Sequence, residues 1–156
     1  MSDARPDPSA AAVLAEEATL VFPGFSHDDA WVLGGIITGL AQDRELPVAI
    51  DIRRGDQQVF HAALRGSTAD NDDWIARKVA TARRFERSSL VVRLRAAEDG
   101  SDLQWLDRAV YAISGGCVPV KLDGEVLVGT VTVSGLPDVD DHALVVEGMR
   151  RFLGSR

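Results

Sequence analysis

The sequence predicts one α/β (α+β) domain in which helices cover both faces of an antiparallel sheet. Its length of 156 residues suits one ordinary domain. Two pairs of strand-like segments are each joined by a short turn that contains glycine, which is typical of β-hairpins. Segments with apolar residues at three- and four-residue spacing lie before, between and after these pairs. Hairpins with helices on both sides are typical of a layered domain.

The N-terminal part is predicted to hold two helices after a disordered lead. Residues 1–9 form this lead, because they carry two prolines, two aspartates and little apolar content. Residues 10–156 form the single domain. Its first helix is expected from residue 10 to about residue 20, and Ser26 is expected to cap the second. The buried stripe of the second helix is predicted to consist of Trp31, Leu33, Ile36, Ile37 and Leu40.

Two adjacent glycines, Gly34 and Gly35, interrupt the second helix. A glycine inside a helix costs about 1 kcal/mol against alanine. We therefore expect a neighbouring element to approach closely here; the alternative is a local kink.

Two hairpins are predicted to build the sheet. Residues 46–53 alternate apolar and polar side chains, and a short turn joins them to a second strand at 57–64. The second hairpin pairs residues 118–122 with residues 126–133 through an Asp-Gly dipeptide, which readily supplies the positive φ angles of a type I′ turn. Residues 88–96 fit either a further strand or a short helix.

Helices are predicted between and after the hairpins. The helix over residues 71–87 has acidic residues at its start and arginines at its end, which matches the helix dipole. Residues 102–109 are also expected to be helical. The last helix, over about 139–153, is expected to be capped by Asp138, with Asp141 three residues on as in a capping box.

Composition and charge argue against several classes of protein. Seventeen Lys+Arg against twenty-four Asp+Glu give a net charge of −7, whereas nucleic-acid binders neutralise phosphates with positive charge. One cysteine excludes an internal disulfide and a cysteine-based zinc site. No tight metal-ligand spacing is present, although His142 beside two aspartates leaves that alternative open. Apolar stretches are too short to span a bilayer, and no secretory signal is visible, so we expect a soluble cytoplasmic domain.

One helix face is predicted to line a polar pocket. Asn71, Trp74 and Lys78 lie at i, i+3 and i+7, so they present an amide, an indole and an ammonium together. With Asp51 and Arg53 from the neighbouring strand they are expected to bind an anionic small molecule. The structural alternative is that Asn71 caps the helix, Trp74 fills a core or an interface, and Lys78 pairs with an acidic side chain.

The last hairpin supplies a second candidate ligand site. Gly115, Gly116 and Ser134 flank it, and His142 lies in the first turn of the last helix. The glycines either leave room for a ligand or permit turns with positive φ. The helix dipole favours a neutral imidazole at His142, which would be free to act as a ligand or base. His61 in the second strand is a further candidate; the alternative for both histidines is a structural hydrogen bond.

Residues 74–96 concentrate positive charge, with seven basic residues against the single acidic Glu86. Such a segment can bind an anionic group or meet an acidic surface of a neighbouring subunit. Asp138, Asp140 and Asp141 are the natural acidic counterpart. The alternative is an ordinary solvated helix face.

A series of short motifs resembles one known family over roughly residues 20–153. The motifs cover residues 25–33, 46–53, 60–61, 70–78, 84–85, 88–89, 115–119, 129–137 and 141–147. Together they are similar to an uncharacterised branch of the GlcG/HbpS-like family, also called the haem-degrading domain family. The resemblance implies a profilin-like fold with a five-stranded antiparallel sheet between helices, assembly into homo-oligomers, and haem as the ligand of some members.

The haem that the resemblance implies would need an axial ligand. The candidates are His27, His61, His142, Tyr111 and Cys117. Relatives often carry a histidine directly before the Gly-Gly pair, where this chain has Ser114. If that histidine binds a ligand in relatives, this chain has lost it.

These observations together predict a homo-oligomeric protein that binds a small ligand, with haem as the ligand suggested by the resemblance. Two other classes remain open. One is a non-catalytic interaction scaffold that recruits partners through the charge-segregated surface. The other is an enzyme that acts on a small anionic metabolite with Asp51, Lys78 and His142. No complete catalytic constellation, such as a GxSxG elbow, is present in the sequence.

Overall fold

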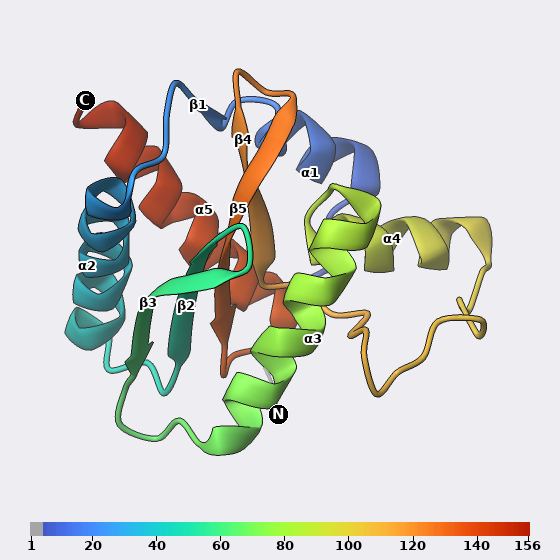
Figure 1. Ribbon diagram of the computed structural model, residues 1–156. Coiled ribbons are helices and arrows are strands. Elements are labelled where there is room, and N and C mark those ends of the chain that lie inside the picture. The colour runs from blue at the N-terminus through green and yellow to red at the C-terminus, as the bar shows by residue number, and fades with distance from the viewer. Residues whose placement is uncertain (1–4) are drawn as a thin grey trace.

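The structure, a computed structural model, describes residues 5–156. Residues 1–4, which belong to the predicted lead, lie outside the described residues. The elements in chain order are α1 (Ala10–Glu17), β1 (Val21–Phe22), α2 (His27–Asp43), β2 (Ala49–Arg54), β3 (Gln57–Ala63), α3 (Ala69–Phe85), α4 (Ser89–Asp99), β4 (Cys117–Leu122), β5 (Val126–Ser134) and α5 (Asp138–Gly154) (Figure 1).

The five described strands form one mixed sheet in the order β1-β4-β5-β2-β3. Both predicted hairpins are present, and β2 pairs antiparallel with β5 to join them. The prediction of a purely antiparallel sheet is wrong at one edge, because β1 pairs parallel with β4. This strand has two residues, too few to show an alternating pattern in the sequence.

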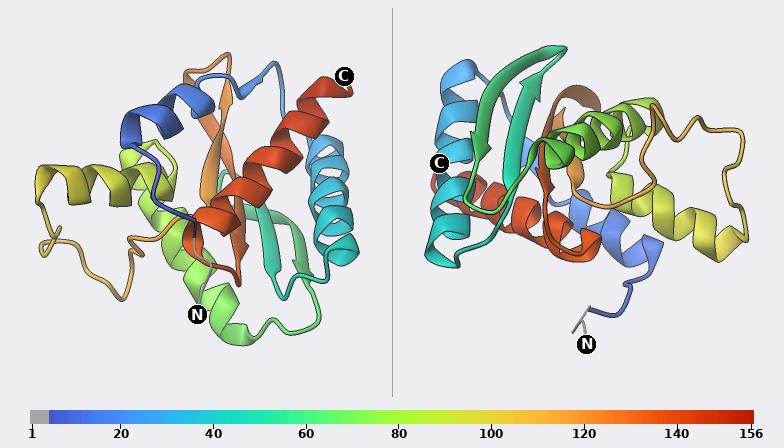
Figure 2. Two further views of the ribbon diagram at one scale, coloured as in Figure 1. Left: turned by 180° about the vertical axis from the view of Figure 1, so that it is seen from behind. Right: turned by 90° about the horizontal axis from the view of Figure 1, so that it is seen from below.

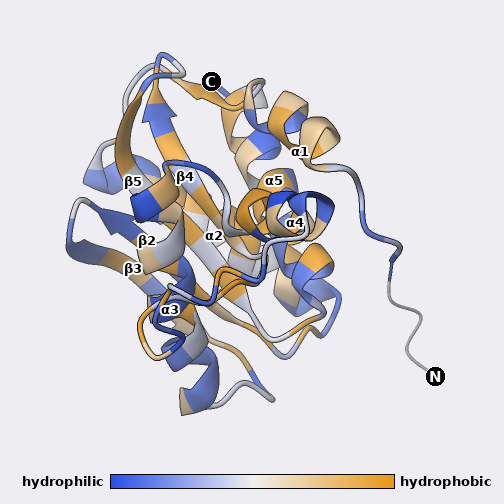
Figure 3. Cartoon of the chain, turned by 90° about the vertical axis from the view of Figure 1, so that its right-hand side faces the viewer, coloured by the Kyte–Doolittle hydropathy of each residue, from blue (hydrophilic) through white to orange (hydrophobic). Residues whose placement is uncertain are grey.

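Helices cover both faces of the sheet (Figure 2). The main hydrophobic core lies between the sheet and the pair α2 and α5, and it includes Phe22, Ile37, Ile52, Val131 and Met149. On the opposite face α3 packs a smaller apolar cluster through Ile75, Val79 and Ala82. Beside β4, α1 and α4 pack against each other. Hydrophobic residues concentrate along β4 and β5, and hydrophilic residues along the stretch before α1 (Figure 3).

The sheet face under α3 is polar, unlike the face under α2 and α5. Side chains alternate between faces along a strand. Ile50, Ile52 and Val133 therefore point into the main core, whereas Asp51 and Thr132, which face each other across β2 and β5, point toward α3. This polar face positions the site described below.

The close approach predicted at the glycine pair is present at one of the two glycines. A Cβ on Gly34 would lie 2.5 Å from the Phe60 ring, whereas nothing lies within 4 Å of a Cβ on Gly35. Trp31 does not belong to the buried stripe as predicted, because its residue is 63% exposed. Its indole packs edge-on against Phe60, with ring centroids 5.2 Å apart, on the outside of the molecule. Leu33, Ile37 and Leu40 are buried as expected.

The structure settles two further segments, one that the sequence left open between strand and helix and one that was expected to be helical. Residues 89–96 belong to helix α4 and Ser88 is its N-cap, so this segment is not a strand. Residues 102–109 are not helical; this segment is held by turns and by the Arg108 guanidinium, which donates to the carbonyls of Asp102, Leu103 and Leu106. A side chain therefore satisfies carbonyls that a helix would satisfy with backbone N–H groups.

Candidate functional site

A pocket of about 290 Å³ opens on the polar side of the sheet, between α3, the segment before β4 and the start of α5. We call it the polar pocket. Its lining residues are Asn71, Trp74, Lys78, Ser114, Ser134, Gly135, Leu136, Asp138 and Asp141.

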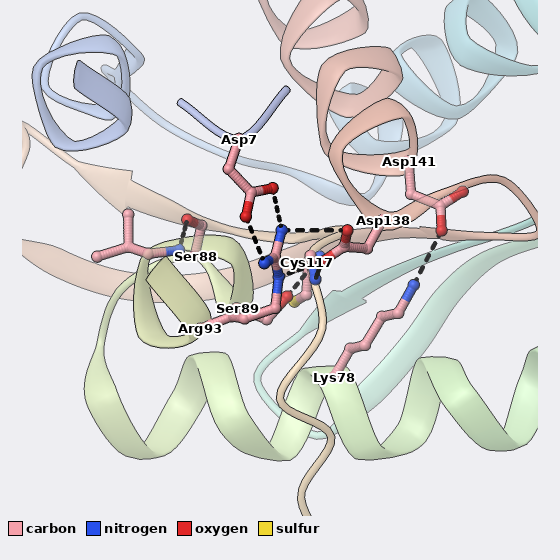
Figure 4. A network of polar contacts seen from close by, with 10 residues as sticks. Asp7, Lys78, Ser88, Ser89, Arg93, Cys117, Asp138 and Asp141 are labelled. Atoms are coloured by element: carbon pink, nitrogen blue, oxygen red, sulfur yellow. Dashed lines mark hydrogen bonds and ion pairs between the residues drawn. The ribbon is translucent and has the colours of Figure 1, made fainter. Parts of the chain in front are cut away.

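A buried ion pair forms the floor of the polar pocket. Lys78 lies on the sheet-facing side of α3 and is 2% exposed, and Asp141 in the first turn of α5 is 1% exposed. The Lys78 Nζ donates to Asp141 Oδ2 at 3.1 Å (Figure 4). It also donates to the Val133 carbonyl at 3.1 Å. These are two acceptors for three N–H donors, so one N–H of Lys78 has no acceptor among residues 5–156.

The Asp141 carboxylate is held on both oxygens. Its Oδ1 accepts from the Leu136 backbone N–H at 2.9 Å, and its Oδ2 accepts from Lys78. Burial raises the pKa of Asp141 to about 6, although the Lys78 ammonium acts in the opposite direction. The predicted capping box at this helix is therefore absent. Pro137 occupies the N-cap position, and Asp141 serves the pocket instead.

The Asn71 amide is oriented by the start of α3. Its Oδ1 accepts from the Thr68 backbone N–H at 2.9 Å, which completes a capping box. The NH₂ group must then point the other way, and its Nδ2 lies 3.5 Å from Ser134 Oγ inside the pocket wall. Asn71 thus caps the helix, as the structural alternative expected, and also presents donors to the pocket.

Asp138 at the pocket rim is neutralised by its neighbours. The Arg93 Nε donates to Asp138 Oδ2 at 2.6 Å, and the same guanidinium forms a bidentate pair with Asp7 (Figure 4). These carboxylates raise the pKa of Arg93, and Arg93 lowers the pKa of Asp7. Asp138 Oδ2 also accepts from the Gly115 N–H at 2.8 Å. The Asp138 carboxylate therefore accepts hydrogen bonds from Arg93 and from the Gly115 N–H. It does not cap α5, contrary to the prediction.

Four residues from the two candidate groups meet in the polar pocket. Asn71, Trp74 and Lys78 come from the predicted helix face, and Ser134 comes from the last hairpin. Gly116 lies behind the floor, since a Cβ there would be 2.8 Å from Lys78 Nζ.

Gly115 also packs closely, because its Cβ would lie 2.8 Å from the Asp138 carbonyl oxygen. Both glycines therefore allow a close approach to the pocket floor and rim.

The other predicted site residues lie outside the polar pocket. Asp51 is buried on the same sheet face, where it accepts from Arg53 Nε at 3.0 Å and from Gln58 Nε2 at 2.6 Å. His61 on β3 pairs through Nε2 with Asp72 Oδ1 at 2.7 Å. Asp51, Arg53 and His61 are held by these contacts and do not line the polar pocket.

His142 faces a different pocket, of about 250 Å³, between α1 and α5. The His142 side chain is 4% exposed. Nε2 contacts Glu16 Oε1 at 3.0 Å, and this contact lowers the pKa of Glu16. Nδ1 is buried without a hydrogen-bond partner among residues 5–156. This hydrogen bond to Glu16 is the structural role that was expected as the alternative to ligand binding at His142.

Sequence reasoning did not assign Ser114, Gly135, Leu136, Asp138 and Asp141 to the polar pocket. Three acidic residues in one helical turn were a signal, but helix capping and the dipole explain such residues equally well. The partner of Lys78 lies 63 residues away in sequence, a separation that a periodicity argument does not cover.

No group of three or more His, Cys, Asp and Glu side chains suited to a metal ion occurs among residues 5–156. In the same range no helix is long and apolar enough to cross a membrane.

Fold and site together define the class: a small α+β domain with a polar pocket between its sheet, one covering helix and the start of its last helix. The chain belongs to the family of haem-degrading, HbpS-like proteins, whose model matches residues 25–150. The resemblance seen in the sequence is thereby confirmed.

Three comparisons with known proteins show what the chain is similar to. The chain is 49% identical over 157 residues to a UPF0303 protein of Streptomyces coelicolor, with 99% of each chain covered. The crystal structure of the Ybr137w protein matches with a TM-score of 0.86 at 29% identity, over 93% of this chain and 88% of that one. The PduOC:heme complex matches with a TM-score of 0.70 over 81% of this chain and 94% of that one. Its 18% identity shows the fold alone.

Proposed function

We propose that this chain binds a small polar molecule in the polar pocket. The observation that supports this most directly is the buried Lys78–Asp141 pair at the pocket floor. Placing two charges out of water is costly, and a buried pair is therefore weak evidence for a purely stabilising role. Here the pair lies beside the amide of Asn71 and the hydroxyl of Ser134, so several polar groups converge on one small cavity.

Of the alternative functions, catalysis by Asp51, Lys78 and His142 together has no geometric support, because only Lys78 lines the polar pocket. The scaffold alternative retains one favourable observation. Arg84 lies over the Trp105 and Tyr111 rings at 5.0 and 5.4 Å to the centroids, so the basic segment carries an exposed arginine–aromatic surface.

The proposed acidic counterpart of that surface is already engaged within the chain. Each of the three aspartates in the first turn of α5 has an ion-pair partner there. These pairs are Asp138 with Arg93, Asp140 with Arg5, and Asp141 with Lys78. We retain a homo-oligomeric assembly, a single domain over residues 10–156 and a cytoplasmic location as proposals that come from the sequence.

The side chains expected to ligate haem do not fit it in this conformation. His27 contacts Gln57 and Arg54, His61 is paired with Asp72, and Tyr111 accepts from Arg84. Burial raises the pKa of Cys117 to about 12, so its thiol stays protonated and is a poor iron ligand.

His142 offers only Nδ1, the ring nitrogen next to Cβ, and that atom is enclosed by the protein. Its pocket of about 250 Å³ is smaller than the roughly 300–1,000 Å³ typical of sites for drug-sized ligands. We therefore propose a smaller polar ligand.

Replacing Asn71 by Asp is expected to weaken ligand binding about tenfold or more with little change in thermal stability. Asp retains the oxygen that caps Thr68 N–H at the start of α3, but it replaces the NH₂ donors with an anionic oxygen. A panel of small hydroxy acids, keto acids and amides, screened by thermal shift and then calorimetry, measures the effect. Gln104→Glu, which adds the same charge at an exposed position outside the pocket, is the control. Equal affinity of the Asn71→Asp and control proteins would place the ligand elsewhere.

A haemin titration is expected to give no saturable Soret shift that depends on His61 or His142. The measurement is absorption at stoichiometric ratios, with His61→Ala and His142→Ala run beside the unaltered protein. The reason is that both imidazoles are held by carboxylates, at Asp72 and Glu16. A stoichiometric shift that one substitution abolishes would show that the ring rearranges to bind haem, and it would restore haem as the ligand.

A further inference from the structure

We propose that the ligand of the polar pocket carries a carboxylate, and that Asp141 takes up a proton when this carboxylate binds. This inference rests on the proposed function and names the ligand class of the same site. The binding step adds the ligand anion and one proton from solvent, which forms the O–H bond of the Asp141 carboxylic acid.

The donors at the pocket favour an anionic oxygen ligand. Lys78 Nζ has one N–H free of its two acceptors, and the Asn71 NH₂ group is turned inward by the cap contact of its oxygen. The pocket also includes the first turn of α5, whose dipole favours negative charge. A carboxylate can accept from Lys78 and Asn71 at once, and such charge-assisted hydrogen bonds are the strong ones.

Charge balance then requires the second part of the proposal. Among the residues that line the pocket, Lys78 supplies the positive charge, and Arg93 behind the rim is already shared by Asp138 and Asp7. A bound carboxylate would place two anions, its own and Asp141, on one buried ammonium. Two carboxylates that share a site cannot both stay ionised at little cost, so one of them gains a proton.

Asp141 is the group best placed to take this proton. Burial has already raised its pKa to about 6, and the Leu136 N–H needs only one of its oxygens as an acceptor. The other titratable groups nearby already have charged or hydrogen-bonding partners, or stay protonated. On α5, Asp138 is held by Arg93 of α4 and His142 by Glu16 of α1.

On the sheet side, the Cys117 thiol of β4 has a pKa raised to about 12 and stays protonated. Farther along the same face, Asp51 of β2 is held by Arg53 and Gln58. These contacts leave the Lys78–Asp141 pair as the unit that responds to the ligand charge.

The test uses the unaltered protein and calorimetric titration with lactate and pyruvate, with lactamide as the uncharged probe. Titrations near pH 7 in phosphate and in Tris, whose ionisation enthalpies differ, report proton uptake directly. We expect carboxylate binding with uptake of a fraction of a proton that approaches one. We also expect the affinity to rise by up to about tenfold per pH unit as the pH falls from about 8 to about 6.

Two variants locate the proton. Asp141→Asn keeps an oxygen for the Leu136 N–H and is expected to abolish proton uptake, whereas Asp140→Asn, in the same turn of α5 but outside the pocket lining, is expected to retain it. The measurements on the unaltered protein stand even where a variant fails to fold. Carboxylate binding without proton uptake, or binding of lactamide in preference to lactate, would overturn this inference and leave the proposed function intact. No binding of any small polar molecule from the wider panel would overturn both.

Discussion

Replacing Lys78 by Met is expected to lower the free energy of unfolding by about 3 to 5 kcal/mol at alkaline pH, where Asp141 stays ionised. The substitution leaves the Asp141 carboxylate 1% exposed and without its counter-charge. Removing one partner of a buried pair is costly because the remaining charge cannot return to water. Urea denaturation followed by circular dichroism measures the loss.

The double variant Lys78→Met/Asp141→Asn is expected to recover most of this loss. It removes both charges, and the Asn oxygen can still accept from the Leu136 N–H. Neutral replacements of a whole buried pair are often tolerated. A coupling energy of less than about 0.5 kcal/mol between the two sites would contradict this expectation, because it would mean that the two side chains act independently.

The pH dependence of the free energy of unfolding of the Lys78→Met variant follows from the same ion pair. Burial raises the pKa of Asp141 to about 6, above its value in the unfolded chain, so the folded protein binds the extra proton. Lys78 lowers this pKa, so in the variant the pKa of Asp141 lies above 6 and its carboxylate gains the proton first. The deficit of the variant against the unaltered protein is therefore expected to shrink as the pH falls toward about 6 and to level off below it, where Asp141 is protonated in both proteins. A deficit that grows on acidification would argue against this origin.

The fold was largely predictable because its signals are local. The Asp-Gly turn between β4 and β5 adopts the positive φ angles that the dipeptide predicts, 52° at Asp123 and 78° at Gly124. The alternation in β2 depends on neighbouring residues in the same way. The short β1 strand and the segment at residues 102–109 were not predictable, because long-range pairing and one arginine side chain hold them.

Only one wall of the candidate site was predictable from the sequence. The spacing of Asn71, Trp74 and Lys78 identified one wall of the polar pocket, because helical periodicity fixes which side chains share a face. Periodicity carries no information about the partner on another element. Asp141 was therefore interpreted as part of a helix cap, and His142, one residue further on, was placed in a site that it does not line.

Gly135, directly after β5, shows how the structure decides why a glycine is needed beside a hairpin. A glycine there can leave room for a close neighbour or permit a positive φ. The structure shows a φ of 145° together with a close backbone approach, since a Cβ would lie 2.3 Å from the Pro47 carbonyl oxygen and 3.0 Å from Val48 Cα. Neither neighbour is a flexible side chain, so neither can rotate away.

Replacing Gly135 by Ala is therefore expected to lower the free energy of unfolding by about 4 kcal/mol, from backbone strain and overpacking together. Gly124→Ala is the matched control. That glycine also has a positive φ, of 78°, but the nearest atom to a Cβ is 4.0 Å away, so only about 1 kcal/mol of conformational cost is expected. Urea denaturation of both variants measures the two losses. A loss at Gly135 no larger than the loss at Gly124 would contradict this expectation. A larger loss is expected because strain and the close approach of residues 47–48 act together at Gly135, directly before Leu136, whose N–H holds Asp141 at the pocket floor.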